Sequence, residues 1–273
     1  MKVATYNINS VNAHLESFCA WLQTEHPDIV LLQEIKCEFN AFPLFEINTV
    51  GYEARILGQK SYNGVAILSP HKMQIEEENL PGFTDENARY LQAKVDCSGK
   101  EIRMASIYLP NGNPPYNDAA DTSRLAYKLQ WLDAFIKQTQ KLVHSPIPVV
   151  LGGDFNIILS DKDVYNPELF RGGALYRPEV TNRLKAIFHQ GWSDAFRLSQ
   201  NGSNTLRQKT ENGYTYWDYA GGAFANDLGL RIDYQLLSPK AADRLEKCWV
   251  DKTLRRGAKP SDHTVLMTEL NWD

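Results

Sequence analysis

The sequence predicts an α/β fold in which two mixed β-sheets pack face to face, with helices on the outside. Short apolar runs typical of strands alternate with segments whose apolar residues recur at helical spacing. The strand-like runs are too many for one small sheet, and some neighbours are joined by short turns, which indicates mixed sheets. No internal repeat or linker divides the chain, so we expect one continuous domain over residues 1–273.

The chain opens with an expected strand, helix and strand. Apolar runs at residues 3–8 and 28–33 are the two strands. Between them, apolar side chains recur at helical spacing at Val11, Leu15, Phe18 and Leu22. Further runs are predicted strands, at residues 64–68, 90–95, 102–108, 149–152, 232–237 and 264–270. Cys97-Ser98-Gly99-Lys100 joins two of these runs, which predicts a hairpin.

Two more helices are expected later in the chain. One begins at Thr122 or Ser123. Its apolar face consists of Leu125, Leu129, Leu132 and Ile136. The other helix has its apolar residues at Leu184, Ile187 and Phe188.

Composition limits the classes of function. The 273 residues have a net charge of −4, so the chain is not a strongly basic nucleic-acid binder, and any DNA contact must be local. Candidate phosphate contacts form three basic clusters: Arg171, Arg177 and Arg183; Arg207 and Lys209; and Lys252, Arg255, Arg256 and Lys259. Solvated surface charge is the commoner role for any one cluster. No apolar run reaches the roughly 18 residues needed to cross a bilayer and no export signal is evident, so we expect a cytoplasmic protein without a membrane partner.

Polar side chains follow the expected strands at the points where the strands end. Asn7 and Asn9 follow the first strand, Gln33-Glu34 the second, and Asp154 and Asn156 the run at 149–152. Such placement is typical of sites at the edge of an α/β sheet. A carboxylate after a doubly buried run is costly unless it is paired or binds a cation, although Glu34 could also emerge into solvent. For Asp154 and Asn156, an Asx turn is the alternative to a functional site.

Asp233 and His263 are the expected catalytic pair. Asp233 lies in an apolar run and needs a partner, and a histidine held by a carboxylate is a frequent catalytic arrangement. The alternative is a surface histidine beside Asp262 as a turn or cap residue. The chain lacks paired zinc-histidine spacing, a serine nucleophile elbow and a Walker lysine loop. Oxygen ligands without thiolate or histidine pairs favour a hard cation, Mg²⁺ or Mn²⁺.

Short motifs occur in the order Asn7, Gln33-Glu34, Gly153-Asp154-Phe155-Asn156, Arg231-Ile232-Asp233 and Ser261-Asp262-His263. Between them lie Gly58-Gln59-Lys60, Tyr108-Leu109-Pro110-Asn111-Gly112 and Tyr216-Trp217-Asp218-Tyr219. Each motif is weak alone, but their order is specific. In this combination, from Thr5 to near the C-terminus, the sequence resembles the exonuclease III family of abasic-site (AP) endonucleases, within the endonuclease/exonuclease/phosphatase superfamily.

The resemblance implies a four-layered α/β sandwich, formed by a single catalytic domain, with the site at one edge of the paired sheets. The implied metal site, with Glu34 as principal ligand, draws on Asn7, Glu34, Asp154, Asn156, Asp262 and His263. The implied catalytic residues are Tyr108, Asp154, Asn156, Asp233 and His263. Asp154 would orient or deprotonate the attacking water, and Asp233 would orient His263 toward a phosphate oxygen.

The same resemblance implies substrate contacts at Lys36, Arg89, Asn111, Tyr216, Trp217, Leu230 and Ile232. Asn111, with Asn156, would bind the phosphate. The aromatic and apolar members would form a pocket for a flipped abasic sugar, although packing in the core is the ordinary role of such residues. Asn12 stands where many family members have an arginine, so one expected contact to the DNA backbone is in doubt.

The implied activity is cleavage of double-stranded DNA on the 5′ side of abasic sites by a monomer that uses Mg²⁺ or Mn²⁺. Cleaning of blocked 3′ ends and 3′ to 5′ exonuclease digestion are further activities of the family. Two alternatives stay open: another phosphodiesterase of the superfamily, such as a sphingomyelinase or inositol-phosphate phosphatase, and a non-catalytic DNA-binding relative. Trp217 and Gly229-Leu230-Arg231 disfavour the first, and competent side chains throughout the proposed site disfavour the second.

Overall fold

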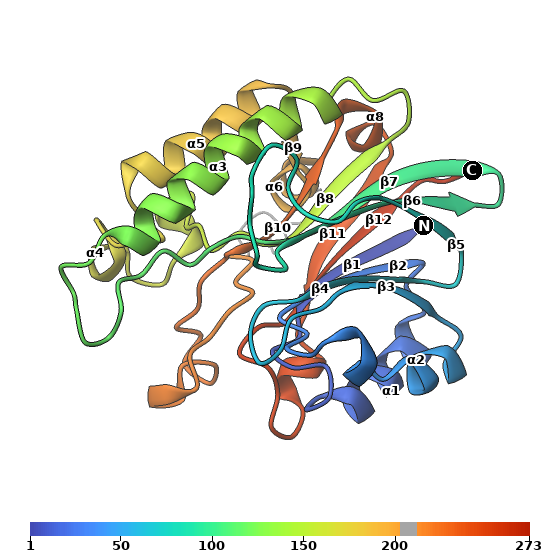
Figure 1. Ribbon diagram of the computed structural model, residues 1–273, viewed down its shortest axis with the longest axis horizontal. Coiled ribbons are helices and arrows are strands. Elements are labelled where there is room, and N and C mark those ends of the chain that lie inside the picture. The colour runs from blue at the N-terminus through green and yellow to red at the C-terminus, as the bar shows by residue number, and fades with distance from the viewer. Residues whose placement is uncertain (203–211) are drawn as a thin grey trace.

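The computed structural model describes residues 1–202 and 212–273, and within these ranges the strands form two six-stranded sheets that lie face to face (Figure 1). The first sheet contains, from edge to edge, β11 (Leu245–Asp251), β12 (Val265–Leu270), β1 (Lys2–Asn7), β2 (Ile29–Gln33), β4 (Val65–Ser69) and β3 (Glu53–Leu57). The second contains β5 (Lys72–Glu77), β6 (Tyr90–Cys97), β7 (Lys100–Tyr108), β8 (Val149–Asp154), β10 (Asp233–Leu237) and β9 (Ser193–Asp194).

Both sheets are mixed, as predicted. β1 pairs with β2 and β7 with β8 in parallel, whereas the other neighbours are antiparallel. The predicted hairpin joins β6 to β7, with Cys97 opposite Lys100. Ser98 and Gly99 between them have φ values of 60° and 87°, and two-residue hairpin turns of this kind require positive φ.

Helices cover both outer faces of the paired sheets (Figure 1). α1 (Leu15–Glu25) and α2 (Leu44–Thr49) pack on the first sheet, and α3 (Ser123–Leu142) and α5 (Pro178–His189) on the second. The shorter helices are η1 (Phe39–Ala41), η2 (Asp161–Asp163), α4 (Pro167–Phe170), α6 (Ala195–Gly202), η3 (Ala220–Gly222), α8 (Pro239–Ala242) and η4 (Leu254–Arg256). In the part of the chain that the structure describes, none of the helices has both the length and the apolar character needed to span a bilayer.

The core consists of three apolar layers, one between the sheets and one beneath each helical face. Alternate residues of an inner strand enter different layers: Val3 of β1 lies between the sheets, and Ala4 faces α1. A strand that is buried on both faces needs apolar residues at nearly every position, so it forms a continuous apolar run in the sequence. The predicted four-layered α/β sandwich is therefore confirmed.

Each of the predicted strands overlaps an observed one, and the helix expected at Thr122 or Ser123 begins at Ser123. The strands that the sequence did not reveal are β3, β5, β9 and β11, and all of them are sheet edges. Edge strands are often short or charged, which protects a sheet from pairing with other chains, and this removes the apolar run by which a strand is recognised. β9 has two residues, and β5 contains Lys72, Glu76 and Glu77.

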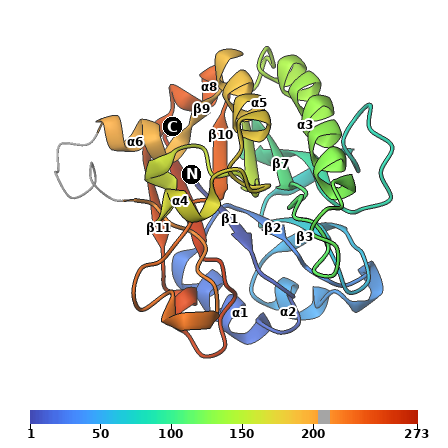
Figure 2. The same cartoon turned by 90° about the vertical axis from the view of Figure 1, so that its left-hand side faces the viewer.

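The two ends of the molecule differ. Both termini lie at one end of the sheets, and α4 and the segment around η3 project from the opposite end (Figure 1). Figure 2 shows this second end facing the viewer. The strands β1, β2, β7 and β8 all finish in polar residues, which places a site there.

Candidate active site

Strand register aligns polar side chains across the second sheet. Tyr108 at the end of β7 is opposite Asp154 at the end of β8, and Asp154 is opposite Asp233 at the start of β10. In the first sheet, Asn7 ends β1 opposite Gln33 of β2, and Glu34 follows. Residues distant in sequence therefore meet at one edge of the sandwich.

A cavity of about 550 Å³ lies at this edge. Its polar side consists of Glu34, Tyr108, Asn111, Asn113, Asp154, Asn156, Asp218, Asp262 and His263. Its apolar side consists of Tyr165, Phe170, Leu175, Ala220, Gly221, Ala223, Tyr216, Leu228, Leu230 and Ile232. A charged half beside an apolar half suits a ligand that has both a phosphate and a less polar group.

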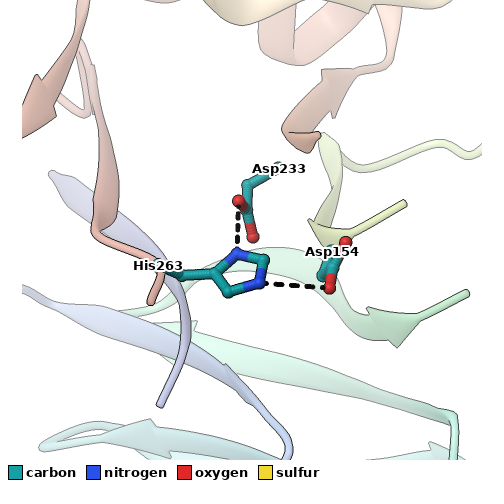
Figure 3. Close-up of side chains that lie close together, drawn as sticks. All are labelled: Asp154, Asp233 and His263. Atoms are coloured by element: carbon teal, nitrogen blue, oxygen red, sulfur yellow. Dashed lines mark hydrogen bonds and ion pairs between the residues drawn. The ribbon is translucent and has the colours of Figure 1, made fainter. Parts of the chain in front are cut away.

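His263 lies between two carboxylates (Figure 3). Its Nδ1 is 2.9 Å from Asp233 Oδ2 and its Nε2 is 3.7 Å from Asp154 Oδ2. Burial of the ring opposes the charged imidazolium, but Asp233 and Asp154 outweigh burial and raise the pKa of His263 to about 10. The ring is therefore protonated at neutral pH. The sequence prediction that Asp233 and His263 form a pair agrees with this geometry.

Asp154 is held by donors from both sheets. Its Oδ2 accepts from Asn7 Nδ2 at 3.0 Å and its Oδ1 from the backbone N–H of Asn156 at 2.8 Å. Burial, together with the charges of Asp233 and Glu34, raises the pKa of Asp154 to about 7, although His263 opposes the shift. A carboxyl group with such a pKa can accept a proton near neutral pH.

Glu34 lies at the rim of the cavity and is not simply exposed to solvent. Its Oε1 accepts from Asn7 Nδ2 at 2.9 Å and its Oε2 is 2.8 Å from Lys36 Nζ. Burial alone would raise the pKa of Glu34, but the hydrogen bonds from Asn7 and Lys36 hold it below its ordinary value. Glu34 also has a φ of 52°, a strained conformation that clusters at functional sites.

Two groups of side chains could hold a cation. Asp154, Asp233 and His263 bring their donor atoms within 4.8 Å of one another. However, both ring nitrogens of His263 already face carboxylates, which favours a hydrogen-bonded group over a metal cluster. Glu34 and Asp262 instead offer carboxylate oxygens at the cavity, with the Asn7 amide beside Glu34. An all-oxygen set of this kind fits Mg²⁺ or Mn²⁺.

The amides of Asn111 and Asn156 lie side by side on the cavity wall. Asn111 Nδ2 donates to Asn156 Oδ1 at 3.1 Å, and Asn156 Nδ2 donates to the Leu109 carbonyl at 3.0 Å. Tyr108 hydrogen bonds to Glu34, and burial and that carboxylate raise the pKa of its phenol well above the ordinary value. The tyrosine therefore stays a neutral donor.

Some predicted substrate contacts lie elsewhere. Trp217 is fully buried outside the cavity lining, where its Nε1 donates to Asp227 Oδ1 at 3.2 Å and Lys252 Nζ lies 4.8 Å from its ring. The structure therefore does not place Trp217 in the lining of this cavity, as predicted for the sugar pocket, but behind its wall. Arg89 also lies behind the cavity lining, with its guanidinium 4.9 Å from the Tyr108 ring.

The basic clusters are largely neutralised within the molecule. Arg171 pairs with Asp161 and Glu168, Arg177 with Glu179, and Arg183 with Asp133. Arg255 is buried and donates to the Trp217 carbonyl at 3.1 Å. Arg256 and Lys259 remain exposed. Arg207 and Lys209 lie outside the described residues. Asn12 is exposed and donates to the Ala41 carbonyl at 3.0 Å.

Several residues of the site were given no role from the sequence. Asn9 donates to Asp262 Oδ1 at 3.1 Å and accepts from Lys36. It therefore links the loop that contains Glu34 and Lys36 to the loop that contains Asp262. Its position two residues after Asn7 was the available indication. Tyr165, Phe170 and Leu175 form much of the apolar wall, but they lie in irregular segments or in the four-residue helix α4, which is too short for a periodic pattern to mark an inward side chain.

The sequence matches the endonuclease/exonuclease/phosphatase family over residues 4–263. It is 26% identical to exodeoxyribonuclease III from Haemophilus influenzae, across 98% of this chain and 99% of that protein. It is also 26% identical to the DNA repair nuclease APEX1 from Danio rerio, across 97% of this chain and 81% of that protein.

Solved structures agree with the sequence matches. An AP endonuclease from Archaeoglobus fulgidus superposes with a TM-score of 0.87 at 29% identity, and the match covers 100% of both chains. The Neisseria 3′ phosphatase NExo, solved with a product DNA hairpin, has a TM-score of 0.87 at 32% identity with the same coverage. The resemblance to exonuclease III enzymes is thereby confirmed, and the chain belongs to the endonuclease/exonuclease/phosphatase family.

Proposed function

We propose that this chain is a divalent-cation-dependent DNA repair phosphodiesterase that cuts double-stranded DNA on the 5′ side of abasic sites. Cleaning of blocked 3′ ends and 3′ to 5′ exonuclease digestion belong to the same proposal. The observation that carries it is the meeting of Glu34, Asp154 and the Asp233–His263 pair at one cavity, from both sheets. The names of the relatives, which include nucleases and a 3′ phosphatase solved with DNA, support a DNA substrate.

Phosphodiester cleavage requires a positioned water, a base and stabilisation of the charge that develops on phosphorus-bound oxygens. Asp154, with a pKa of about 7, is suited to orient the water and take its proton. Protonated His263, held by Asp233, can donate to a phosphate oxygen. The Asn111 amide, one N–H of which is donated to Asn156, supplies a further donor on the same wall.

The cation would be held by Glu34 and Asp262, with Asn7 beside them. When bound, Mg²⁺ or Mn²⁺ supplies Lewis-acid stabilisation of charge on the scissile phosphate and the leaving oxygen. Lys36 Nζ lies 2.8 Å from Glu34 Oε2 and offsets the negative charge of that carboxylate. Asn9 fixes the Asp262 carboxylate at 3.1 Å.

The apolar half of the cavity is suited to a sugar that has lost its base. Tyr216, Leu230 and Ile232 lie beside the catalytic group, and the Tyr216 ring is 5.1 Å from the ring of His263. Extrusion of a nucleotide costs least when it has no base to unstack. This arrangement supports damaged sites over intact DNA as the substrate.

The test is incubation with a duplex that contains one stable abasic analogue, with Mg²⁺, with excess chelator, and with Mg²⁺ restored. We expect a nick on the 5′ side of the analogue that chelator abolishes and Mg²⁺ restores. Matched incubations with sphingomyelin and an inositol phosphate provide the control. Hydrolysis of either control substrate with no nick in the duplex contradicts the proposal.

A further inference from the structure

Lys128 is a lysine with no exposed surface, in the second turn of the amphipathic helix α3. Its Nζ donates to three backbone carbonyls, those of Asn111 at 3.0 Å, Asn156 at 2.7 Å and Ala174 at 3.0 Å. Three acceptors require three N–H donors, which only the ammonium form has. Burial lowers the pKa of Lys128 to about 7, although the nearby charge of Asp154 opposes the shift.

The three carbonyls belong to the loops that form the cavity. Asn111 and Asn156 present the paired amides of the polar wall, and Ala174 precedes Leu175 of the apolar wall. All three lie outside helices and strands, so regular hydrogen bonding does not fix them. Asn156 also has a φ of 49°, a conformation that persists only when its surroundings hold it.

The neighbourhood is shaped to admit this lysine. A Cβ added at Gly112 would lie 2.7 Å from Lys128 Cδ, and the φ of Gly112 is +82°, so a glycine is needed beside the side chain. Most other buried positions of α3, such as Trp131, Leu132 and Phe135, have apolar residues, and the polar exceptions, Gln138 and Thr139, are uncharged. A buried cation is costly, and an apolar residue would satisfy packing alone, so the lysine has another role.

We propose that Lys128 is a positioning residue for the phosphodiester reaction, which holds the loops of Asn111, Asn156 and Ala174 so that the Asn111 amide, oriented by Asn156, meets the scissile phosphate. The inference rests on the proposed function. Because the ammonium ties the loops that follow β7 and β8 to the separate segment of Ala174, the phosphate donor need not reorganise when the substrate binds. The positive charge of Lys128 also lies behind the polar wall of the cavity, which would face the phosphate of the bound substrate.

The test compares Lys128→Met with wild type on the abasic duplex under single-turnover conditions. We expect the cleavage rate to fall by roughly 10- to 100-fold, as for misplacement of groups near a reacting centre, while the Kd for the duplex in chelator changes little. Amide hydrogen exchange in the Asn111 and Asn156 loops should speed up. Gln138→Met is the matched control, because Gln138 is buried on the same helix but bonds to Gln92, at 3.3 Å.

A double-mutant cycle separates positioning from general destabilisation. If Lys128 acts through Asn111, adding Lys128→Met to Asn111→Ala should cost less than Lys128→Met costs alone. The inference is overturned if the loss in cleavage rate of the double variant equals the product of the two single losses. It is also overturned if Lys128→Met cleaves at the wild-type rate. If methionine prevents folding, Lys128→Gln, which keeps two donors, should show the same coupling. Failure of wild type to nick the duplex instead refutes the proposed function, and the role assigned to Lys128 fails with it.

Discussion

The charge state of the site follows from three side chains that share one buried space. His263 is positioned by Asp233 at 2.9 Å and faces Asp154 at 3.7 Å. Two carboxylates around one imidazole keep the ring protonated, because loss of its proton would leave two neighbouring negative charges unneutralised. Burial, with the charges of Asp233 and Glu34, makes Asp154 a stronger base than an ordinary aspartate, although His263 opposes the shift.

These shifts predict how activity depends on pH. Asp154 must be ionised to accept a proton, and its pKa is about 7, so kcat/KM should fall below pH 7, by about tenfold for each pH unit. His263 must keep its proton, and its pKa is about 10, so activity should fall again only above that pH. The measurement is kcat/KM on the abasic duplex from pH 5 to 10 at fixed, saturating Mg²⁺. A flat profile between pH 5 and 8 would contradict the assigned base.

At the scale of elements, the site depends on close contact between β7 and β8. Gly153 lies opposite Ile107, and a Cβ at this position would lie 1.8 Å from the Ile107 carbonyl oxygen. Only a glycine lets the two strands pair here and bring Tyr108 beside Asp154.

Gly153→Ala should therefore destabilise the fold by about 1–3 kcal/mol or more, because backbone atoms must move to relieve the clash. Chemical denaturation measures the free energy of unfolding. Gly202→Ala, at a position with open space around it, is the matched control and should be nearly neutral. Equal stabilities of the two variants would show that β8 tolerates a side chain.

A buried ion network joins the elements behind the apolar wall. Arg231, fully buried before β10, bonds to Asp163 of η2 at 2.6 Å and to Asp194 of β9 at 2.7 Å. Its guanidinium lies 4.4 Å from the Tyr234 ring. The network fixes the segment that continues into Ile232 and Asp233.

Arg231→Met should lower the free energy of unfolding by about 3–5 kcal/mol, because two buried carboxylates lose their shared partner. Thermal and chemical denaturation would measure the loss. Arg183→Met is the control, since its pair with Asp133 is partly exposed and should contribute about 1 kcal/mol at most. Similar losses of unfolding free energy in both variants would show that the buried network stabilises the fold no more than a partly exposed ion pair does.

At the scale of the whole molecule, what the sequence revealed depends on burial. Inner strands such as β2 and β8 are covered on both faces, so their apolar runs were visible, and polar residues after those runs marked Glu34 and Asp154. The edge strands lack such runs because solvent covers one side of them. Edge strands form because they pair with strands distant in the sequence, and the spacing of apolar residues along the chain does not show such pairing.

Tertiary partners also decided which candidate side chains reach the cavity. Trp217 has the sequence context of a substrate contact, yet its indole points to Asp227 beneath a loop. Lys128 lies in an amphipathic helix whose polar residues mostly face solvent, and only the folded chain shows the three carbonyls around it. Hydrogen bonds to loop carbonyls have no fixed spacing in the sequence, so these roles could not have been predicted.

We propose that Asp154, assembled with Glu34 and His263 from both sheets, activates water at a phosphodiester. The most direct measurement is single-turnover cleavage of the abasic duplex by wild type and Asp154→Asn at equal Mg²⁺, with duplex binding measured in parallel. We predict a loss in cleavage rate of roughly 100-fold or more, with binding of the duplex nearly unchanged. Cleavage by Asp154→Asn at the wild-type rate would contradict the account.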